Sequence, residues 1–209
     1  MDILRSELYR TTIRTLRANP VTALLGPRQC GKTTLARDIA DSLKANYFDL
    51  EDPISLRRLS EPMTTLQPLR GLVVIDEIQR LPEFFPLLRV LSDRKPLPLR
   101  FLILGSASLE LSRQSSESLA GRIAFVEMSG FDLSEATNWK RLWWRGSFPR
   151  AYLAKSEADS FSWRSNFIRT FLEKDIREFG VSFPAQTLRR LWMMIAHYHG
   201  QIFNASEVG

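Results

Sequence analysis

The chain has 209 residues, of which 44% are hydrophobic and 25% charged, with a formal net charge of +6 and a pI near 9.8. This composition is typical of a globular protein with room for one ample domain, or for one domain plus a small appendage. No apolar run is long enough to span a bilayer, so we expect no membrane partner. The N-terminus lacks a secretory signal and the single cysteine, Cys30, excludes a disulfide framework, so we expect a cytoplasmic location.

Before Phe131, short apolar runs alternate with segments of helical spacing. Predicted strands cover residues 21–25, 46–50, 72–75, 100–104 and 123–128. Predicted helices cover residues 2–18, 34–43, 53–59 and a stretch that Pro82 opens and that contains residues 84–91, with a loop at Pro62 and Pro68. This alternation predicts an α/β fold with a parallel sheet covered on both faces, whose functional groups gather at the carboxyl ends of the strands.

From Phe131 onward the pattern changes to helices. Residues 156–179 fit one long helix that Gly180 ends, and residues 184–198 fit another that Gly200 ends. Between the sheet and these helices, the tryptophans at positions 139, 143 and 144 precede residues 146–149, which read Gly-Ser-Phe-Pro. We interpret this stretch as a packed turn region and its aromatic side chains as core.

Residues 26–33 read Gly-Pro-Arg-Gln-Cys-Gly-Lys-Thr and match the phosphate-loop pattern G-x-x-x-x-G-K-[ST]. The loop lies between a predicted strand and a predicted helix, which is the context that this motif requires. Its glycines let consecutive backbone N–H groups surround a phosphate chain, and the following helix adds the positive end of its dipole. Lys32 can reach the β- and γ-phosphates, and the Thr33 hydroxyl can ligate Mg²⁺. We therefore predict a nucleotide site rather than a glycine turn with an incidental lysine, and we interpret Cys30 as a filler at a variable loop position.

The second element of the predicted site is acidic. Asp76 and Glu77 directly follow the apolar run at residues 72–75. Asp76 would hold Mg²⁺ through its water shell, because Mg²⁺ keeps several waters and takes few protein carboxylates. Glu77 would orient and deprotonate the attacking water. The alternative, an acidic pair that caps a turn between a strand and a helix, is less favoured because a phosphate loop precedes it in the same predicted sheet.

Two further elements give weaker signals. Ser106 follows Gly105 at the end of a predicted strand, where its hydroxyl could bind the γ-phosphate or the attacking water. Arg122 precedes the last predicted strand. It is a candidate arginine finger, which would act at the nucleotide site of a neighbouring subunit. A surface arginine at the start of a strand is an equally good interpretation.

Five segments, in this order, resemble a family of prokaryotic AAA-type ATPases of the AAA+ superfamily. They are Gly-Pro-Arg-Gln-x-Gly-Lys-Thr-Thr, Tyr-Phe-Asp-Leu-Glu-Asp-Pro, Val-Val-Ile-Asp-Glu-Ile-Gln, Leu-Gly-Ser-Ala-Ser and Leu-Ala-Gly-Arg. In that family a small ATPase core is often followed by a C-terminal domain of uncharacterised function. The resemblance covers essentially the whole chain. Its most specific parts are the phosphate loop and the apolar strand that ends in Asp76 and Glu77.

The resemblance implies a P-loop NTPase fold of the AAA+/ASCE type, with an extra strand between the phosphate-loop strand and the Asp-Glu strand. It implies ATP and Mg²⁺ as ligands, with Mg²⁺ held by Thr33 and Asp76. The catalytic residues that it implies are Lys32, Glu77, Ser106 and Arg122. The nucleotide-binding residues that it implies are Gly26, Pro27, Arg28, Gln29, Cys30, Gly31, Lys32, Thr33 and Thr34.

We expect residues 1–135 to form the ATPase core and residues 136–209 to form a helical segment that leads into a winged helix. In the resembling family, the helices after Gly180 continue into a winged helix and a further domain. Here residues 188–198, followed by residues 200–209, resemble the opening of that winged helix, so we expect a C-terminally truncated member of the family.

The leading hypothesis is an ATPase whose hydrolysis drives a conformational change. The alternative is a nucleotide-dependent switch that contacts DNA or a protein through the C-terminal segment with little turnover. A shortened chain that keeps the fold without efficient activity is a third hypothesis. The positive charge permits contact with polyanions, but the arginines are spread along the chain.

ATP rather than GTP follows from the resemblance, since the guanine-specific motif Asn-Lys-x-Asp does not occur. A finger in trans at Arg122 would require a homo-oligomer.

Overall fold

The computed structural model describes residues 3–106 and 118–201. The chain divides into two compact units, Met1–Leu153 and Ala154–Gly209. Within the described residues, no helix combines the length and the apolar character that crossing a membrane would take.

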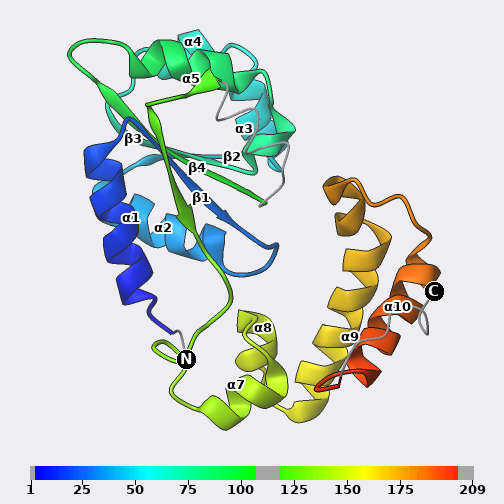
Figure 1. Ribbon diagram of the computed structural model, residues 1–209. Coiled ribbons are helices and arrows are strands. Elements are labelled where there is room, and N and C mark those ends of the chain that lie inside the picture. Colours follow the sequence, from blue (N-terminus) through cyan, green and yellow to red (C-terminus); the bar gives the residue numbers. More distant parts are fainter. Residues whose placement is uncertain (1–2, 107–117, 202–209) are drawn as a thin grey trace. The chain divides into compact units, whose positions relative to one another are not determined.

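The first unit is built on a five-stranded parallel sheet (Figure 1). Its strands are β1 (Val21–Gly26), β2 (Asn46–Asp49), β3 (Gly71–Asp76), β4 (Leu99–Ser106) and β5 (Ile123–Glu127). Their order in the sheet is β2-β3-β4-β1-β5. The expected extra strand is confirmed, because β4 lies between the phosphate-loop strand β1 and the Asp-Glu strand β3. In register, Gly26 pairs with Ser106 and Asp49 pairs with Asp76, so Gly26, Ser106 and Asp76 lie at the carboxyl ends of the parallel strands.

Helices cover both faces of the sheet, as Figure 1 shows. On one face lie α1 (Ser6–Ala18) and α2 (Lys32–Leu43), and on the other lie α3 (Pro53–Arg58), α4 (Pro62–Leu66) and α5 (Phe84–Ser92). Because side chains alternate along a strand, each strand supplies both layers. Leu24, Val74 and Leu102 pack in the layer with α1 and α2, whereas the residues next to them pack in the layer with α5. This two-layer core confirms the predicted α/β fold.

Several predicted boundaries differ from those in the structure. The first helix begins at Ser6 rather than at residue 2, and the helix after the phosphate loop begins at Lys32, two residues before the predicted start. Pro62 opens the short helix α4 instead of marking a loop. Proline is compatible with the first turn of a helix, where its missing N–H would have no partner.

The first unit ends with two short helices, α7 (Trp139–Arg145) and α8 (Pro149–Tyr152). The predicted packed turn with core tryptophans is therefore wrong. The tryptophans lie on α7 and are 60%, 80% and 66% exposed. The inward stripe of α7 carries Leu142 and the buried Arg145 instead, and Arg145 donates a hydrogen bond to the Tyr152 carbonyl. A helix of two turns buries one stripe, so the tryptophans remain outside.

The second unit contains α9 (Glu157–Glu173), the 3₁₀ helix η2 (Asp175–Phe179) and α10 (Ala185–His197). The single helix predicted over 156–179 is interrupted at Lys174, where φ is −124°, and Gly180 ends η2 with a φ of +79°. Three rings stack along α9 at helical spacing, and the last of them, Phe171, contacts Trp192 of α10 at 5.6 Å between ring centroids. The expected opening of a winged helix stays a prediction, because residues 202–209 lie outside the described residues.

Candidate functional site

The phosphate loop connects β1 to α2 and has the backbone that its glycines allow. A Cβ at Gly26 would lie 2.0 Å from the Met128 carbonyl oxygen, so no side chain fits at that position. Gly31 has a φ of +101° and precedes α2, and left-handed backbone of this kind favours glycine. No side chain in the described part of the chain caps α2, so the first N–H groups of the helix are left for an anion.

The ammonium group of Lys32 lies inside the loop. Its Nζ donates hydrogen bonds to the Gly26 carbonyl at 2.8 Å and to the Pro27 carbonyl at 2.9 Å. The side chain is 6% exposed. The loop therefore holds a buried positive charge beside the N-terminus of α2, where the phosphates of a nucleotide would bind.

Asp76 joins β3 to the phosphate loop. Its Oδ2 accepts a hydrogen bond from Thr33 Oγ1 at 2.8 Å, and its Oδ1 accepts one from the Glu77 N–H at 3.0 Å. The carboxylate is 2% exposed. A hydroxyl and a carboxylate at this distance are the oxygen donors that Mg²⁺ takes beside a phosphate chain, so the residues present fit that ion.

Tyr47 is a site residue that sequence reasoning missed. It lies on β2, and its hydroxyl donates to Asp76 Oδ2 at 2.7 Å. Burial, and then the hydrogen bond to Asp76 and the charge of Asp76, raise the pKa of the Tyr47 phenol above its ordinary value. The phenol therefore stays a donor. Tyr47 belongs to the segment Tyr-Phe-Asp-Leu-Glu-Asp-Pro, so the resemblance marked the segment but no role for the tyrosine.

Glu77 follows Asp76 and is the N-cap of the 3₁₀ helix η1 (Ile78–Arg80) with a φ of +57°. Few residues other than glycine adopt such a backbone, and those that do gather at functional sites. Its carboxylate accepts a hydrogen bond from the Gln79 amide. Burial, and then the neighbouring charge of Asp76, raise the pKa of Glu77 above its ordinary value. A raised pKa makes a carboxylate a stronger base, in keeping with the predicted role.

Ser106 ends β4 directly beside Gly26. The residue is 5% exposed, and its Oγ has no hydrogen-bond partner among residues 3–106 and 118–201. Buried polar groups in folded proteins are nearly always paired. An unpaired hydroxyl beside the phosphate loop therefore fits a polar ligand at this position.

The remaining loop residues differ in their surroundings. Cys30 is fully buried, and burial raises the pKa of its thiol. Pro27 and Gln29 are exposed, Arg28 is half-buried, and Thr34 is exposed on the first turn of α2.

Arg122 lies away from this edge of the sheet. Its carbonyl accepts the N–H of Val21, the first residue of β1, so it sits at the amino ends of the parallel strands, opposite the phosphate loop. Its guanidinium donates to both carboxylate oxygens of Asp93, at 2.7 and 3.0 Å. The structure therefore does not bring Arg122 to the site of its own chain.

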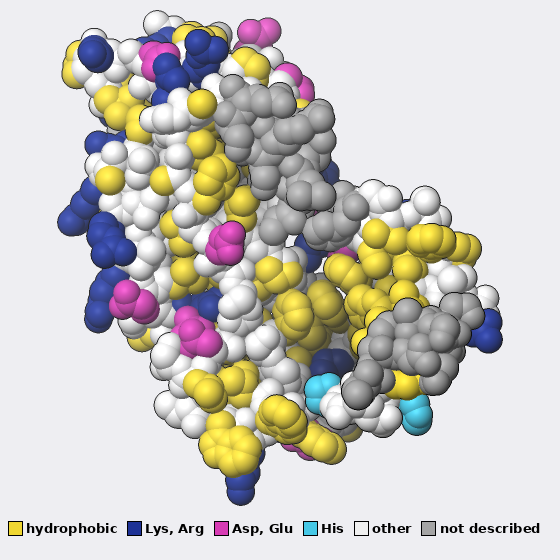
Figure 2. All heavy atoms as spheres, viewed as in Figure 1, with side chains coloured by type: hydrophobic (Ala, Val, Ile, Leu, Met, Phe, Trp, Pro, Cys, Tyr) yellow, Lys and Arg dark blue, Asp and Glu magenta, His cyan; other side chains and the backbone are white. Residues whose placement is uncertain are grey.

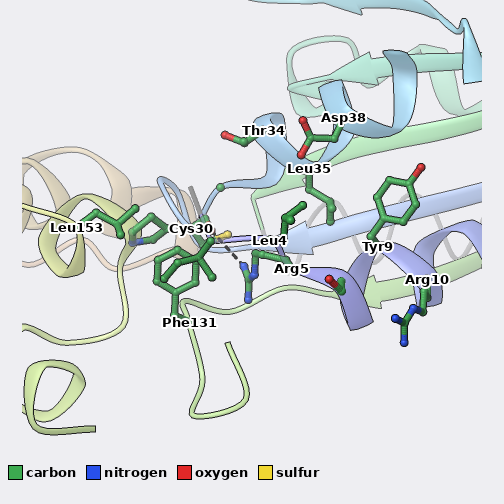
Figure 3. Close-up of a pocket in the computed structure, with 14 residues that line it drawn as sticks. Leu4, Arg5, Tyr9, Arg10, Cys30, Thr34, Leu35, Asp38, Phe131 and Leu153 are labelled. Carbon is green, nitrogen blue, oxygen red and sulfur yellow. Dashed lines mark hydrogen bonds between the residues drawn. The ribbon is translucent and has the colours of Figure 1, made fainter. Parts of the chain in front are cut away.

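A cavity of about 690 Å³ adjoins the phosphate loop. Figure 3 shows Phe131 and Leu153 on one side of it and Tyr9 and Asp38 on the other, with Leu35 of α2 between. Its lining is mostly apolar, which is typical of a site for the planar base of a nucleotide.

Arg5, which sequence reasoning missed, lines this cavity and hydrogen-bonds segments that lie far apart in the sequence. Its guanidinium donates to the carbonyls of Cys30, Ser129 and Gly130, at 3.3, 2.9 and 3.1 Å. It also pairs with Glu135 at 2.7 Å. These partners lie up to 130 residues away along the chain, so no local pattern indicated them.

Comparisons with known proteins agree with this fold. A family model described as an AAA domain matches residues 18–137, and one described as a domain of unknown function (DUF8612) matches residues 136–209. The chain is 50% identical over its whole length to uncharacterised proteins of Mycobacterium bovis and Mycobacterium tuberculosis. It spans about half the length of these curated relatives, since the match covers 48% of each. A solved structure, a Walker-type ATPase of Pyrococcus abyssi, is 15% identical with a TM-score of 0.60, over 91% of this chain and 78% of that one, and shares the fold.

Proposed function

The chain belongs to the AAA domain family, and from this premise we propose that it is a magnesium-dependent ATPase whose hydrolysis drives a conformational change. The observation that carries the proposal is the 2.8 Å hydrogen bond between Thr33 and Asp76. It joins the phosphate loop to the acidic strand across the intervening strand β4, as binding a nucleotide together with Mg²⁺ requires.

In this proposal the loop residues 26–34 bind the triphosphate of ATP, and Lys32 contributes its charge at the β- and γ-phosphates. The adenine ring of ATP lies in the apolar cavity beside Leu35 and Phe131. Thr33 and Asp76 would hold Mg²⁺, which when bound neutralises charge on the phosphates. Glu77 takes a proton from the attacking water, and Ser106 donates a hydrogen bond at the γ-phosphate. The charge that develops on the transferred group is met by Arg122 of a neighbouring copy.

We further propose that residues 1–135 form the ATPase core and that residues 136–209 form the segment that receives the conformational change. The two matching family models meet at residues 136–137, which supports this division. A cytoplasmic location is supported by the single cysteine, a free thiol that is buried in the phosphate loop.

The first test of the proposal is steady-state ATP hydrolysis by the 209-residue chain over a range of protein concentrations, with Mg²⁺ and with EDTA. We expect hydrolysis that EDTA abolishes and that rises faster than linearly with protein concentration. Arg122→Ala is expected to remove the faster-than-linear part, because an arginine supplied in trans raises turnover by about 10³–10⁵-fold. Asp93→Ala is the matched control, since it breaks the same ion pair and keeps the arginine. Equal losses in the two variants would assign Arg122 a structural role instead.

A second candidate function is a nucleotide-dependent switch that binds nucleic acid, and it is favoured by the exposed face of α1. Arg10, Arg14 and Arg17 recur there at helical spacing and line a groove of about 320 Å³ with Tyr9 and Ile13. Figure 2 shows Lys and Arg side chains along one edge of the molecule. Arginines bind phosphates through paired N–H groups, and a tyrosine offers a stacking surface.

Fluorescence anisotropy with labelled DNA, at several salt concentrations and with or without ATP, tests this candidate. We expect salt-sensitive binding that changes with ATP, and we expect changing Arg10, Arg14 and Arg17 to alanine to lower the salt slope by about one per lost phosphate contact. The control changes the exposed Arg57, Arg70 and Arg89 to alanine, which removes the same charge from other helices and loops. Equal weakening by both triple variants would mean a diffuse effect of net charge rather than a binding face on α1.

A further inference from the structure

The carboxylate of Asp76 is oriented by donors from three places in the chain. Thr33, from the first turn of α2, and Tyr47, from β2, both donate to Oδ2, at 2.8 and 2.7 Å. The Glu77 N–H donates to Oδ1 at 3.0 Å. The carboxylate is almost fully buried, so these donors determine which way its oxygens face.

Tyr47 differs from Thr33 because it comes from a strand of the sheet and not from the segment that would bind nucleotide. The strand β2 pairs in parallel with β3, with Tyr47 opposite Val74 and Asp49 opposite Asp76. The ring packs against the apolar layer between the sheet and α1 and α2, and the guanidinium carbon of Arg37 lies 5.7 Å from the ring centroid. Thr33, by contrast, belongs to the phosphate loop and helix that would bind nucleotide, and it would also be a ligand of Mg²⁺.

We propose that Tyr47 is a positioning residue of the magnesium site, which acts by holding Asp76 in the orientation that Mg²⁺ binding needs. The proposal rests on the magnesium-dependent ATP binding proposed above and adds a residue that acts through Asp76. Partners that orient a metal ligand matter greatly, and their removal commonly costs 10–100-fold in metal affinity. Removing the Tyr47 hydroxyl should therefore weaken the response to Mg²⁺ and leave the magnesium-free contacts to the nucleotide in place.

The test is a magnesium titration of the binding of a fluorescent ATP analogue to the full chain, with Tyr47→Phe compared with the unchanged protein. Phenylalanine keeps the ring and removes only the hydroxyl. We expect the Mg²⁺ concentration at half-maximal binding to rise about tenfold or more, while the affinity for the analogue in EDTA changes less than about twofold. This split separates positioning from a general loss of structure, which would weaken binding under both conditions.

Tyr152→Phe is the matched control, because it removes a tyrosine hydroxyl from the same compact unit, where the ring of Tyr152 packs edge-on against Phe131. We expect it to leave the magnesium midpoint unchanged. Thermal unfolding of both variants in EDTA checks that they fold. An unchanged magnesium midpoint in a folded Tyr47→Phe protein, or an equal loss of affinity with Mg²⁺ and with EDTA, would overturn the proposal. If the unchanged protein bound the analogue equally well with Mg²⁺ and EDTA, the proposed function would fail first, and this proposal with it.

Discussion

Changing Lys32 to alanine is expected to abolish measurable ATP binding, and with it hydrolysis. The Lys32 ammonium is buried in the loop, where its Nζ lies 2.8 and 2.9 Å from two backbone carbonyls. The variant would lose the positive charge and would also leave these carbonyl oxygens without the donor that they now have. A hydrogen bond to a charged group contributes about 1.5–3 kcal/mol, and Lys32 can make more than one, so a loss of affinity of at least ~100-fold follows.

Isothermal titration calorimetry with ATP and Mg²⁺ measures this loss. Lys155→Ala is the control, because it removes one exposed ammonium outside the loop and should leave the affinity unchanged. Unfolding of Lys32→Ala without nucleotide must remain cooperative, since a collapsed loop would otherwise explain the result. Binding of ATP within about threefold of the unchanged protein would contradict the assigned role of Lys32 and the nucleotide site built around it.

The sheet and the phosphate loop could be predicted from the sequence because both depend on local patterns. The parallel strands β1, β3 and β4 are continuous apolar runs, and buried parallel strands require such runs. The loop motif fixes its residue types at fixed spacing. The position of β4 between β1 and β3 came from the family resemblance, since periodicity carries no information on the order of strands in a sheet.

The contacts around the site could not be predicted, because they join segments that are remote in sequence. The hydroxyl of Tyr47 and the carboxylate of Asp76 meet only because β2 pairs with β3 in one register. Arg5 reaches Glu135 only because the N-terminal segment packs beside the chain that follows β5. The exposed tryptophans of α7 show the same limit, since aromatic residues at helical spacing do not reveal that Arg145 takes the inward position.

Changing Glu77 to glutamine is expected to leave ATP bound and almost unhydrolysed. The amide keeps the size of the side chain and can still accept a hydrogen bond from Gln79, but it cannot accept a proton from water. General-base catalysis contributes about 10²–10⁴-fold to turnover, so single-turnover hydrolysis should slow by that factor. Affinity for ATP should change little, because the binding contacts assigned to the loop, to Thr33 and to Asp76 remain.

Glu51→Gln is the matched control. It removes a half-exposed carboxylate that pairs with Arg80 at 3.2 Å and whose charge also acts on Glu77, and it should keep hydrolysis within about twofold of the unchanged rate. Rapid-quench measurement of bound and hydrolysed ATP on the same sample separates binding from chemistry. If Glu77→Gln hydrolysed ATP at the unchanged rate, Glu77 would not be the base. If neither protein hydrolysed bound ATP, the result would favour a nucleotide-dependent switch or a shortened chain that keeps the fold without efficient activity.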